Sequence, residues 1–360
     1  MRFIHCADFH IDSPLSYLTA EEDQKDKKDS LLVEFRQMVS YARDHAIDAV
    51  LISGDLFDSD YVSRTAAFSV RQIIADSPAV DFYYLRGNHD KSGIFRSDMK
   101  PDNLFCFGDS WTYYEPLPGI TISGIETDGL RSDAASELEL LPDDFNLVML
   151  HGNPDDFGNL AHRNIDYLAM GHIHKPSSRK IDNRARMVYP GCPMGRGWDE
   201  TGPRGFVVLD VNDHSHYFDF HFVDFASSHF YRFEADVTGC SGSEEMLKKI
   251  QAALAESGES SGILPSFDDR IRVDLTGTLD PDAEKNRAYI TASLKTSYRH
   301  IELSDHTRIR AESLDAASGA NGKGIRSRFI NLVMNDKDLD PAMQNEVLET
   351  GLRLLGGDRL

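Results

Sequence analysis

Cysteine is scarce in this sequence, and the few cysteines form neither a metal-binding nor a disulfide pattern. The 360 residues include only four, Cys6, Cys106, Cys192 and Cys240. They are scattered, none belongs to a Cys-x-x-Cys pair, and most fall in apolar surroundings. A thiolate metal site and a disulfide framework are therefore both unexpected, and reduced thiols in the cytoplasm are the simplest interpretation.

Long hydrophobic runs are missing as well. No stretch approaches the roughly 20 apolar residues that are needed to span a bilayer. The N-terminus leads directly into a strand-like segment, without the basic region and apolar core of an export signal. We therefore expect a cytoplasmic protein with no membrane association. Because the chain is longer than one typical hydrophobic core requires, we expect two domains.

Positive charge is also in deficit, with 38 Lys and Arg against 59 Asp and Glu and a formal net charge of −21. This balance argues against tight binding of a polyanion such as nucleic acid by this chain alone. Residues 175 to 204 reverse the trend, because they hold seven basic residues against three acidic ones. Beside a metal centre the basic residues would hold phosphates; the alternative is an ordinary solvated loop. They are Lys175, Arg179, Lys180, Arg184, Arg186, Arg196 and Arg204.

Against these absences stand five short segments rich in metal-ligand side chains. Each directly follows an apolar run typical of a buried strand, so the ligands should gather at the carboxyl ends of the strands, along one edge. Singly, most of these patterns are weak evidence, but all five in this order indicate one two-metal phosphoesterase site. The segments are Asp8-Phe9-His10, Gly54-Asp55, Gly87-Asn88-His89-Asp90, His151-Gly152 and Gly171-His172-Ile173-His174.

The order of the predicted elements indicates an α/β fold. Three strand-like runs alternate with two helical stretches, about 31 to 45 and 64 to 75, which predicts parallel β-α-β units. The charged run from 21 to 29 is interpreted as a solvated loop. After residue 97 the strands become shorter, and we expect two layers of sheet flanked by helices.

Composition divides the chain into three parts. Residues 1–225 carry all five ligand segments, residues 226–310 have the pattern of a small α+β accessory domain, and residues 311–360 contain a linker rich in small residues followed by a helical tail. In the tail, Leu348, Leu352 and Leu355 form one apolar stripe. This stripe packs on its own domain or, alternatively, docks onto a helix of a partner.

Hydrolysis of a phosphodiester needs a nucleophile at neutral pH, neutralisation of developing charge and help for the leaving oxygen. Two metals roughly 3.5 to 4 Å apart supply all three. Such a pair needs a bridging carboxylate, for which Asp55 is the natural candidate. Imidazole, carboxylate and amide ligands suit Mn²⁺, Fe²⁺ or Zn²⁺, and the sequence does not choose among them. We expect Asp8, His10 and His174 to complete one metal site and Asn88, His151 and His172 to complete the other.

His89 adjoins the expected ligand Asn88, so it can face a substrate without binding metal. We expect it to protonate the leaving oxygen or to stabilise charge in the transition state. Asp90 would then orient or charge-tune that imidazole. Two other residues receive structural interpretations: His5 as a satisfied core residue within the first strand, and Asp58 as a turn cap.

Longer strings around these motifs resemble one enzyme family. They are residues 5–14 (His-Cys-Ala-Asp-Phe-His-Ile-Asp-Ser-Pro), residues 54–58 (Gly-Asp-Leu-Phe-Asp), and residues 189–191 (Tyr-Pro-Gly) followed by 195–197 (Gly-Arg-Gly). Over about residues 1–225 the chain is similar to the calcineurin-like metallophosphoesterases, and within them to the bacterial SbcD and YhaO-type DNA repair exonucleases.

The resemblance implies a four-layer metallophosphoesterase fold and a Mn²⁺-dependent DNA nuclease that uses the ligands named above. It further implies a small domain that caps access to DNA, an SbcC-like ABC ATPase partner bound through the C-terminal region, and association into homodimers. One position departs from the family. Asp58 stands where archaeal and eukaryotic members place a histidine, so a second catalytic histidine is not carried over.

Three functions remain open from the sequence. The first is a DNA repair exonuclease or endonuclease acting with the ATPase, which the basic segment and the accessory domain favour. The second is a phosphodiesterase for a small molecule such as a cyclic nucleotide, which the acidity favours. The third is a non-catalytic, metal-bound assembly scaffold, against which the intact Asn88-His89 pair argues.

Overall fold

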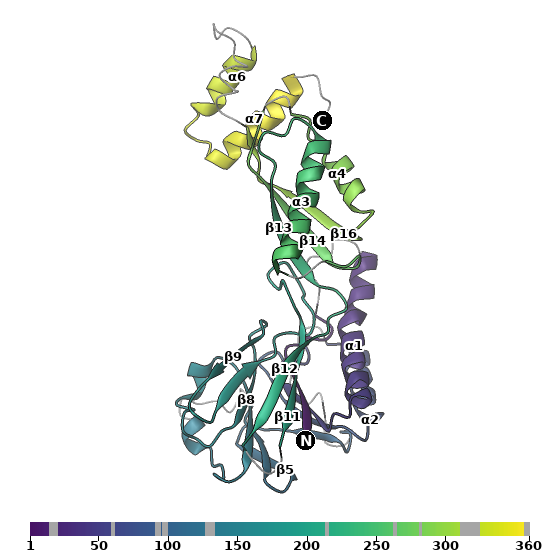
Figure 1. Cartoon of the computed structure of the whole chain (residues 1–360), viewed down its shortest axis with the longest axis vertical. Helices are drawn as coiled ribbons and strands as arrows, with labels where there is room; N and C mark the ends of the chain where they lie inside the picture. The colour runs from purple at the N-terminus through teal and green to yellow at the C-terminus, as the bar shows by residue number, and fades with distance from the viewer. Residues whose placement is uncertain are drawn as a thin grey trace. The chain divides into compact units, whose positions relative to one another are not determined.

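The structure is a computed structural model that divides the chain into two compact units, Met1–His229 and Phe230–Leu360 (Figure 1). None of the described helices is both long and apolar enough to cross a membrane. The expected linker from 311 to 324 lies outside the described residues. The structure describes residues 1–13, 21–58, 62–90, 95, 100–126, 134–212, 216–261, 265–280, 283–309 and 325–355.

Six strands form the first sheet of the Met1–His229 unit, in the order β12-β11-β1-β2-β3-β4. Strands β1 to β4 are parallel neighbours, whereas β11 is antiparallel to both β1 and β12. The parallel part therefore brings the carboxyl ends of β1, β2 and β3 to one edge. The strands are β1 (Arg2–Cys6), β2 (Ala49–Ser53), β3 (Asp81–Leu85), β4 (Leu104–Cys106), β11 (Gly205–Val211) and β12 (Phe218–Asp224).

A second six-stranded sheet has the order β5-β6-β7-β8-β10-β9. Within it β6, β7, β8 and β10 are parallel neighbours, and the two edge strands are antiparallel to theirs. The strands are β5 (Thr112–Leu117), β6 (Ile120–Gly124), β7 (Phe145–His151), β8 (Tyr167–Gly171), β9 (Ser177–Lys180) and β10 (Arg186–Tyr189). Two short 3-10 helices, η2 (Ala134–Glu137) and η3 (Pro154–Phe157), lie in the connections.

Alternation along the strands explains how the layers pack, because successive side chains of a strand point to opposite faces. Phe3 and Leu51 pack against Leu147 of the second sheet. Their neighbours Ile4 and Val50 pack on the other face, in a core shared with α1 (Glu21–Asp44) and α2 (Arg64–Ala75). Both faces of β1 and β2 are thus buried, as the unbroken apolar runs predicted. The predicted α/β fold, with two sheets flanked by helices, is confirmed.

Helix α1 is longer than the sequence suggested. The charged run from 21 to 29, interpreted as a loop, forms the first turns of this helix. The run is rich in Glu, Lys and Gln, which favour helix, and it places opposite charges four residues apart, as in Glu21 with Lys25 and Asp23 with Lys27. Charge alone was therefore a misleading sign of a loop here.

The Phe230–Leu360 unit has a three-stranded parallel sheet in the order β13-β14-β16 and a short pair, β15 with β17. Helices α3 and α4 cover one face of the sheet, where Ile250 and Ile290 pack with Val273 and Leu303. The strands are β13 (Phe230–Asp236), β14 (Arg270–Thr276), β15 (Thr278–Leu279), β16 (His300–Asp305) and β17 (Arg308–Ile309), and the helices are α3 (Ser243–Ser261) and α4 (Arg287–Leu294).

Two further helices of this unit, α6 (Ile325–Met334) and α7 (Pro341–Leu355), pack on each other. Helix α7 begins at Pro341, where the Asp340 carboxylate accepts a hydrogen bond of 2.9 Å from the backbone N–H of Met343 and the proline occupies the first turn. Ile330, Val333 and Leu348 form the small core between the helices.

His5 lies fully buried between the two sheets. Its Nδ1 is 3.0 Å from the Tyr167 hydroxyl and its Nε2 is 3.2 Å from the Met170 carbonyl oxygen, so both ring nitrogens have partners. Burial lowers the pKa of His5 to about 3. The interpretation of His5 as a satisfied core residue is confirmed.

This burial predicts a pH-dependent stability. The unfolded imidazole takes up a proton below about pH 6.5, whereas the folded one stays neutral until about pH 3. Stability is therefore fully present above pH 6.5 and falls as the pH drops between these values, by up to about 1.4 kcal/mol per unit. The test measures the free energy of unfolding of chelator-treated protein between pH 6.5 and 5. In His5→Gln the slope of this free energy against pH should be smaller than in the wild type, by the equivalent of about one bound proton. The exposed control His221→Gln should leave the slope unchanged; an unchanged slope in both would contradict the assignment.

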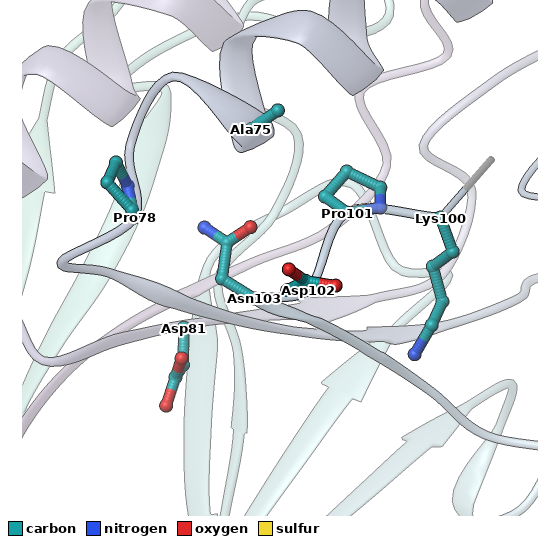
Figure 2. A pocket seen from close by; sticks show the side chains of 7 residues that line it. All are labelled: Ala75, Pro78, Asp81, Lys100, Pro101, Asp102 and Asn103. Atoms are coloured by element: carbon teal, nitrogen blue, oxygen red, sulfur yellow. The ribbon is translucent and has the colours of Figure 1, made fainter.

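A surface pocket lies at the amino-terminal end of β3, away from the ligand segments that follow the strands' carboxyl ends (Figure 2). The Asn103 side chain donates hydrogen bonds of 2.9 to 3.0 Å to the carbonyl oxygens of Ile74 in the last turn of α2 and of Ser77 and Val80 in the turn before β3. Lys100 donates to the Leu104 carbonyl oxygen at 2.6 Å. These hydrogen bonds hold the segments around the pocket together. We therefore assign no catalytic or binding role to this pocket.

Candidate metal centre

The structure brings the five ligand segments together at one end of the Met1–His229 unit. Segments after β1, β2 and β3 come from the first sheet, and those at the ends of β7 and β8 come from the second. The two sheets pack with these strand ends side by side, because β2 lies against both β7 and β8. All seven residues expected to bind metal meet there: Asp8, His10, Asp55, Asn88, His151, His172 and His174.

Two groups of ligand atoms are distinct. In the first, which comprises Asp8, His10 and His174, the Nε2 atoms of the two histidines are 3.4 Å apart and the His174 Nε2 is 3.9 Å from an Asp8 oxygen. The ligand groups of Asp55, His151 and His172 form the second.

Asp55 lies between the two groups. Its Oδ2 is 3.2 Å from Nε2 of His151 in the second group and 3.7 Å from Nε2 of His10 in the first. The Asn88 side-chain oxygen joins the second group, 3.0 Å from the same His151 nitrogen. This is the arrangement that a bridging carboxylate between two cations requires.

The protonation chemistry of the first group fits a cation. Burial and the positive charge of Arg196 lower the pKa of His10 to about 3, so its ring stays neutral and keeps a lone pair. The buried His10 Nδ1 has no hydrogen-bond partner among the described residues. Burial raises the pKa of Asp8 to about 7, although the backbone N–H of His172 lies 3.0 Å from both its oxygens. A nearby divalent cation would reverse that shift, because it favours the charged carboxylate.

In the second group, Asp55 and His151 interact as an ion pair. Burial opposes charge on both, but their mutual hydrogen bond and attraction outweigh it, so the pKa of His151 is raised and that of Asp55 is lowered. The His151 Nδ1 donates to the Ser53 carbonyl oxygen at 2.9 Å, which leaves Nε2 as the nitrogen that faces the site. A metal ion would replace the Nε2 proton, since only neutral imidazole binds metal. The residues present therefore fit two divalent cations.

Backbone conformation at the site is unusual. Asp8, His10, Asp55 and His172 have φ values of 56°, 46°, 50° and 95°, a region that non-glycine residues rarely adopt. Such residues cost of order 1 to 3 kcal/mol each and persist where surrounding structure holds them in place. Here the strain turns the side chains away from the strand direction and toward one point.

Glycines of the motifs give the ligands room. A side chain at Gly54, whose φ is +89°, would overlap the His151 ring, and one at Gly87 would overlap the Asp55 carboxylate. A side chain at Gly171 would meet the Ser53 carbonyl oxygen, to which His151 is bonded. The glycines preceding the ligands are thus required by close packing around Asp55 and His151.

His89 lies at the open side of the site. Its ring centroid is 4.9 Å from that of His10, and its side chain is exposed. Its backbone N–H donates to the Asp55 Oδ1 at 2.8 Å, which fixes the loop beside the bridging carboxylate. His89 also groups with His10 and Asp58, whose ligand atoms lie within 4.8 Å of one another. Asp58, interpreted from the sequence only as a turn cap, therefore lies close to His10 and His89 of the site.

Asp90 has a different role from the one expected. Its carboxylate accepts hydrogen bonds from the backbone N–H groups of Leu56, Phe57 and Gly87, at 3.2, 2.8 and 3.0 Å. These bonds occupy both oxygens, and among the described contacts none reaches the His89 ring. Burial raises the pKa of Asp90 to about 6 despite these donors. Asp90 ties the loops after β2 and β3 together and positions the residues they carry.

Several basic residues of the segment from 175 to 204, which were expected to hold phosphates, instead pair with groups of the protein itself. Arg184 is paired with the fully buried Asp166 at 2.7 Å, and the buried Arg204 donates to the His174 carbonyl oxygen. Arg196 is paired with Glu200 at 3.1 Å. Three basic residues remain exposed in or beside edge strand β9: Lys175, Arg179 and Lys180.

Glu200 is the functional residue that the sequence did not reveal. It is 6% exposed, and its Oε1 lies 2.6 Å from the Nδ1 of His174. It follows His174 by 26 positions, so no short-range spacing in the sequence connects the two residues. The only signal was its place directly after the strings at 189–191 and 195–197 that carry part of the family resemblance.

Comparison with known proteins agrees with this geometry. The family model of the calcineurin-like phosphoesterases matches residues 1–176. Residues 1–176 are a calcineurin-like phosphoesterase domain. This domain belongs to a family of metal-dependent phosphoester hydrolases that use a dinuclear centre of divalent metals. Two cations are also what the two ligand groups around Asp55 would hold.

Curated relatives share the region that contains the phosphoesterase domain. The uncharacterized metallophosphoesterase YhaO of Bacillus subtilis is 28% identical over 59% of this chain and 58% of its own length. The DNA double-strand break repair protein Mre11 of Methanopyrus kandleri is 22% identical over 59% of this chain and 54% of its own length. The resemblance to the calcineurin-like metallophosphoesterases, including YhaO, is confirmed. The chain spans just over half the length of these two relatives.

Among solved structures, TT1561 of Thermus thermophilus aligns with a TM-score of 0.40 and 11% identity, covering 61% of this chain and 98% of that one.

Proposed function

We propose that this protein is a two-metal phosphodiesterase that cleaves DNA as a repair nuclease. The observation that carries the proposal is the position of the Asp55 carboxylate between two groups of ligands, with the exposed His89 beside them. A pair of divalent cations held there would supply a nucleophile at neutral pH and neutralise charge on the phosphoryl oxygens. Mn²⁺ is the metal we propose, because the resemblance to the DNA repair exonucleases implies it; the imidazole, carboxylate and amide ligands suit Fe²⁺ and Zn²⁺ as well.

The chain's own residues would divide the remaining work. Asp8, His10 and His174 hold one cation, Asn88, His151 and His172 hold the other, and Asp55 bridges them. His89 is free to reach the substrate, since its side chain is exposed and its main chain is bound to Asp55. There its imidazole would protonate the leaving oxygen or stabilise transition-state charge.

Two observations support DNA as the substrate. One relative is a DNA double-strand break repair protein. In addition, the exposed Lys175, Arg179 and Lys180 follow the last predicted ligand, His174, directly in the chain, and two of them lie on edge strand β9. A phosphate backbone is bound mainly by such exposed cations. The overall charge of −21 opposes tight binding of DNA by these cations alone. We therefore propose that the Phe230–Leu360 unit or a partner makes further contacts with the DNA.

The proposed partner is an ABC-type ATPase bound through the C-terminal region. Among the described side chains of α6 and α7, six apolar ones are exposed, and Ile325 and Leu332 are more than two-thirds exposed, at 74% and 71%. By contrast Leu348, part of the predicted stripe, is buried between the two helices; the side chains of Leu352 and Leu355 lie outside the described part. Exposed apolar residues on a helix pair are typical of a helix-docking surface. The six are Ile325, Leu332, Met334, Met343, Val347 and Leu354.

We also propose a cytoplasmic location. All four cysteines are free, and three of them are buried. Free buried thiols are typical of proteins from reducing compartments.

A single set of assays tests the nuclease proposal against its alternatives. With Mn²⁺ added, linear duplex DNA should be degraded, and the rates are compared with those on a cyclic nucleotide and on bis(p-nitrophenyl) phosphate. Protein with Asp55→Asn, purified in parallel, controls for contaminating nucleases. Intact DNA together with rapid turnover of the small esters would favour a small-molecule phosphodiesterase. Bound Mn²⁺ without turnover of any of the three would favour a scaffold.

A further inference from the structure

The proposed metal ligand His174 is held from the side that faces away from the other ligands. Its Nε2 faces the Nε2 of His10 at 3.4 Å, whereas its Nδ1 lies 2.6 Å from the Glu200 carboxylate. A carboxylate at this distance accepts the Nδ1 proton. A guanidinium nitrogen of Arg196, which can only donate, also lies near Nδ1 but farther away, at 3.2 Å. The closer carboxylate therefore favours the tautomer in which Nδ1 carries the proton and Nε2 carries a free lone pair.

Glu200 is itself fixed by several donors. The backbone N–H of Arg196 donates to its Oε2 at 2.6 Å, and the Arg196 guanidinium donates to its Oε1 at 3.1 Å. The carboxylate is buried, and these donors hold it in one orientation.

The main chain of His174 is held as well. Its carbonyl oxygen accepts hydrogen bonds from the buried guanidinium of Arg204 and, at 3.2 Å, from the backbone N–H of Cys192. The segment from 192 to 204 thus forms hydrogen bonds with both the ring and the backbone of this histidine. Residues whose positive charge suggested phosphate binding serve instead to support one ligand.

We propose that Glu200 is a positioning residue of the metal centre, which fixes the tautomer and direction of His174 and raises the affinity of the site that His174 completes. The inference rests on the metal site assigned under the proposed function. Carboxylate partners of metal-binding histidines orient the ring and increase its basicity, and their loss typically lowers metal affinity about 10- to 100-fold.

The alternative that Glu200 belongs to a separate metal site does not fit its surroundings. The ligand atoms of His174, Cys192 and Glu200 are close enough to one another to hold a cation. However, Arg196 donates to Glu200, and the Arg204 guanidinium lies 3.5 Å from the Cys192 sulfur. The positive charges of the Arg196 and Arg204 guanidinium groups already lie beside Glu200 and Cys192. They would repel a metal ion placed between these side chains.

The two proposed metal sites should respond differently, because their histidines have different partners. The Nδ1 of His174 faces a side-chain carboxylate, whereas the Nδ1 of His151 donates to the backbone carbonyl oxygen of Ser53. Replacement of Glu200 should therefore weaken one Mn²⁺ site and leave the other nearly unchanged. A general loss of stability would weaken both.

The test is calorimetric titration of the metal-free, full-length protein with Mn²⁺, for the wild type and for Glu200→Gln. We expect one of two binding steps to weaken about 10- to 100-fold in the variant. Long-range ¹H–¹⁵N NMR of the metal-free proteins should place the His174 proton on Nδ1 in the wild type and show a mixture of tautomers in the variant. Glu200→Asp, which keeps the charge but shortens the reach, should be intermediate in both measurements.

Asp166→Asn is the matched control, because it removes the charge of another fully buried carboxylate that is paired with an arginine, Arg184. Asp166 precedes β8, whereas His172 and His174 follow that strand, so Mn²⁺ binding should not change. Equal weakening in this control and in Glu200→Gln would overturn the proposal, as would unchanged affinities and tautomer in Glu200→Gln. If Glu200→Gln does not fold, the same two measurements on Glu200→Asp decide. Neither readout involves DNA, and a wild type that binds no Mn²⁺ would instead refute the metal site.

Discussion

Asp55→Asn should abolish tight Mn²⁺ binding and reduce phosphodiester hydrolysis by at least about 10³-fold. The physical reason is the position of this carboxylate. Its Oδ2 faces both groups of ligands, at 3.2 Å from His151 and 3.7 Å from His10, while its Oδ1 accepts the backbone N–H of His89. A neutral amide of the same shape keeps the size of the side chain but removes the charge that would hold two dications together.

The measurement is metal content after dialysis, combined with the rate on bis(p-nitrophenyl) phosphate at saturating Mn²⁺. Asp81→Asn is the matched control, since Asp81 stands at the opposite end of β3 from the ligand segment. That variant should retain two metals and full activity. Two tightly bound Mn²⁺ ions in Asp55→Asn would show that Asp55 does not bridge them.

His89→Ala should lower turnover by about 10² to 10⁴-fold without loss of metal. His89 lies beside the first ligand group, with its ring centroid 4.9 Å from that of His10, but its side chain is exposed and it is not one of the seven proposed ligands. The loss should depend on the leaving group. If His89 protonates the leaving oxygen, the effect will be large for DNA and much smaller for bis(p-nitrophenyl) phosphate, whose nitrophenolate needs little protonation.

An equal loss on both substrates would instead favour stabilisation of transition-state charge, so this comparison separates the two roles expected for His89. His221→Ala, an exposed histidine on β12, serves as control and should have wild-type rates. Loss of both metals in His89→Ala would refute the assignment, because it would place His89 among the ligands. Metal content and rates should therefore be measured on the same preparations.

Much of the fold was predictable from local patterns. Apolar runs identified β1, β2, β3, β7 and β8, and the polar residue after each run identified the ligand segments. Parallel strands place their carboxyl ends at one edge of a sheet, so the clustering of Asp8, Asp55 and Asn88 followed from sequence order alone. That His151 and His174 would join them was inferred from their chemistry, and only the structure shows that they come from a second sheet.

Other features were misjudged because they depend on surroundings rather than on residue type. The charged run from 21 to 29 was interpreted as a loop, yet it begins α1, since opposite charges four residues apart stabilise a helix. Asp90 was expected to orient the neighbouring His89 ring, but its carboxylate points instead to backbone N–H groups of another loop. Sequence adjacency did not decide which group the side chain would contact.

The sequence by itself determined the α/β fold, the set of candidate metal ligands and the place of each at a strand end. These depend on hydrophobic periodicity and on short-range order along the chain. Only the tertiary structure decided that Asp55 lies between the two ligand groups, that Arg204 grips the backbone of His174, and that Glu200 fixes its ring. Those contacts join residues that are from 26 positions apart (His174 and Glu200) to 96 positions apart (Asp55 and His151), so the folded chain, not any local pattern, brings them together.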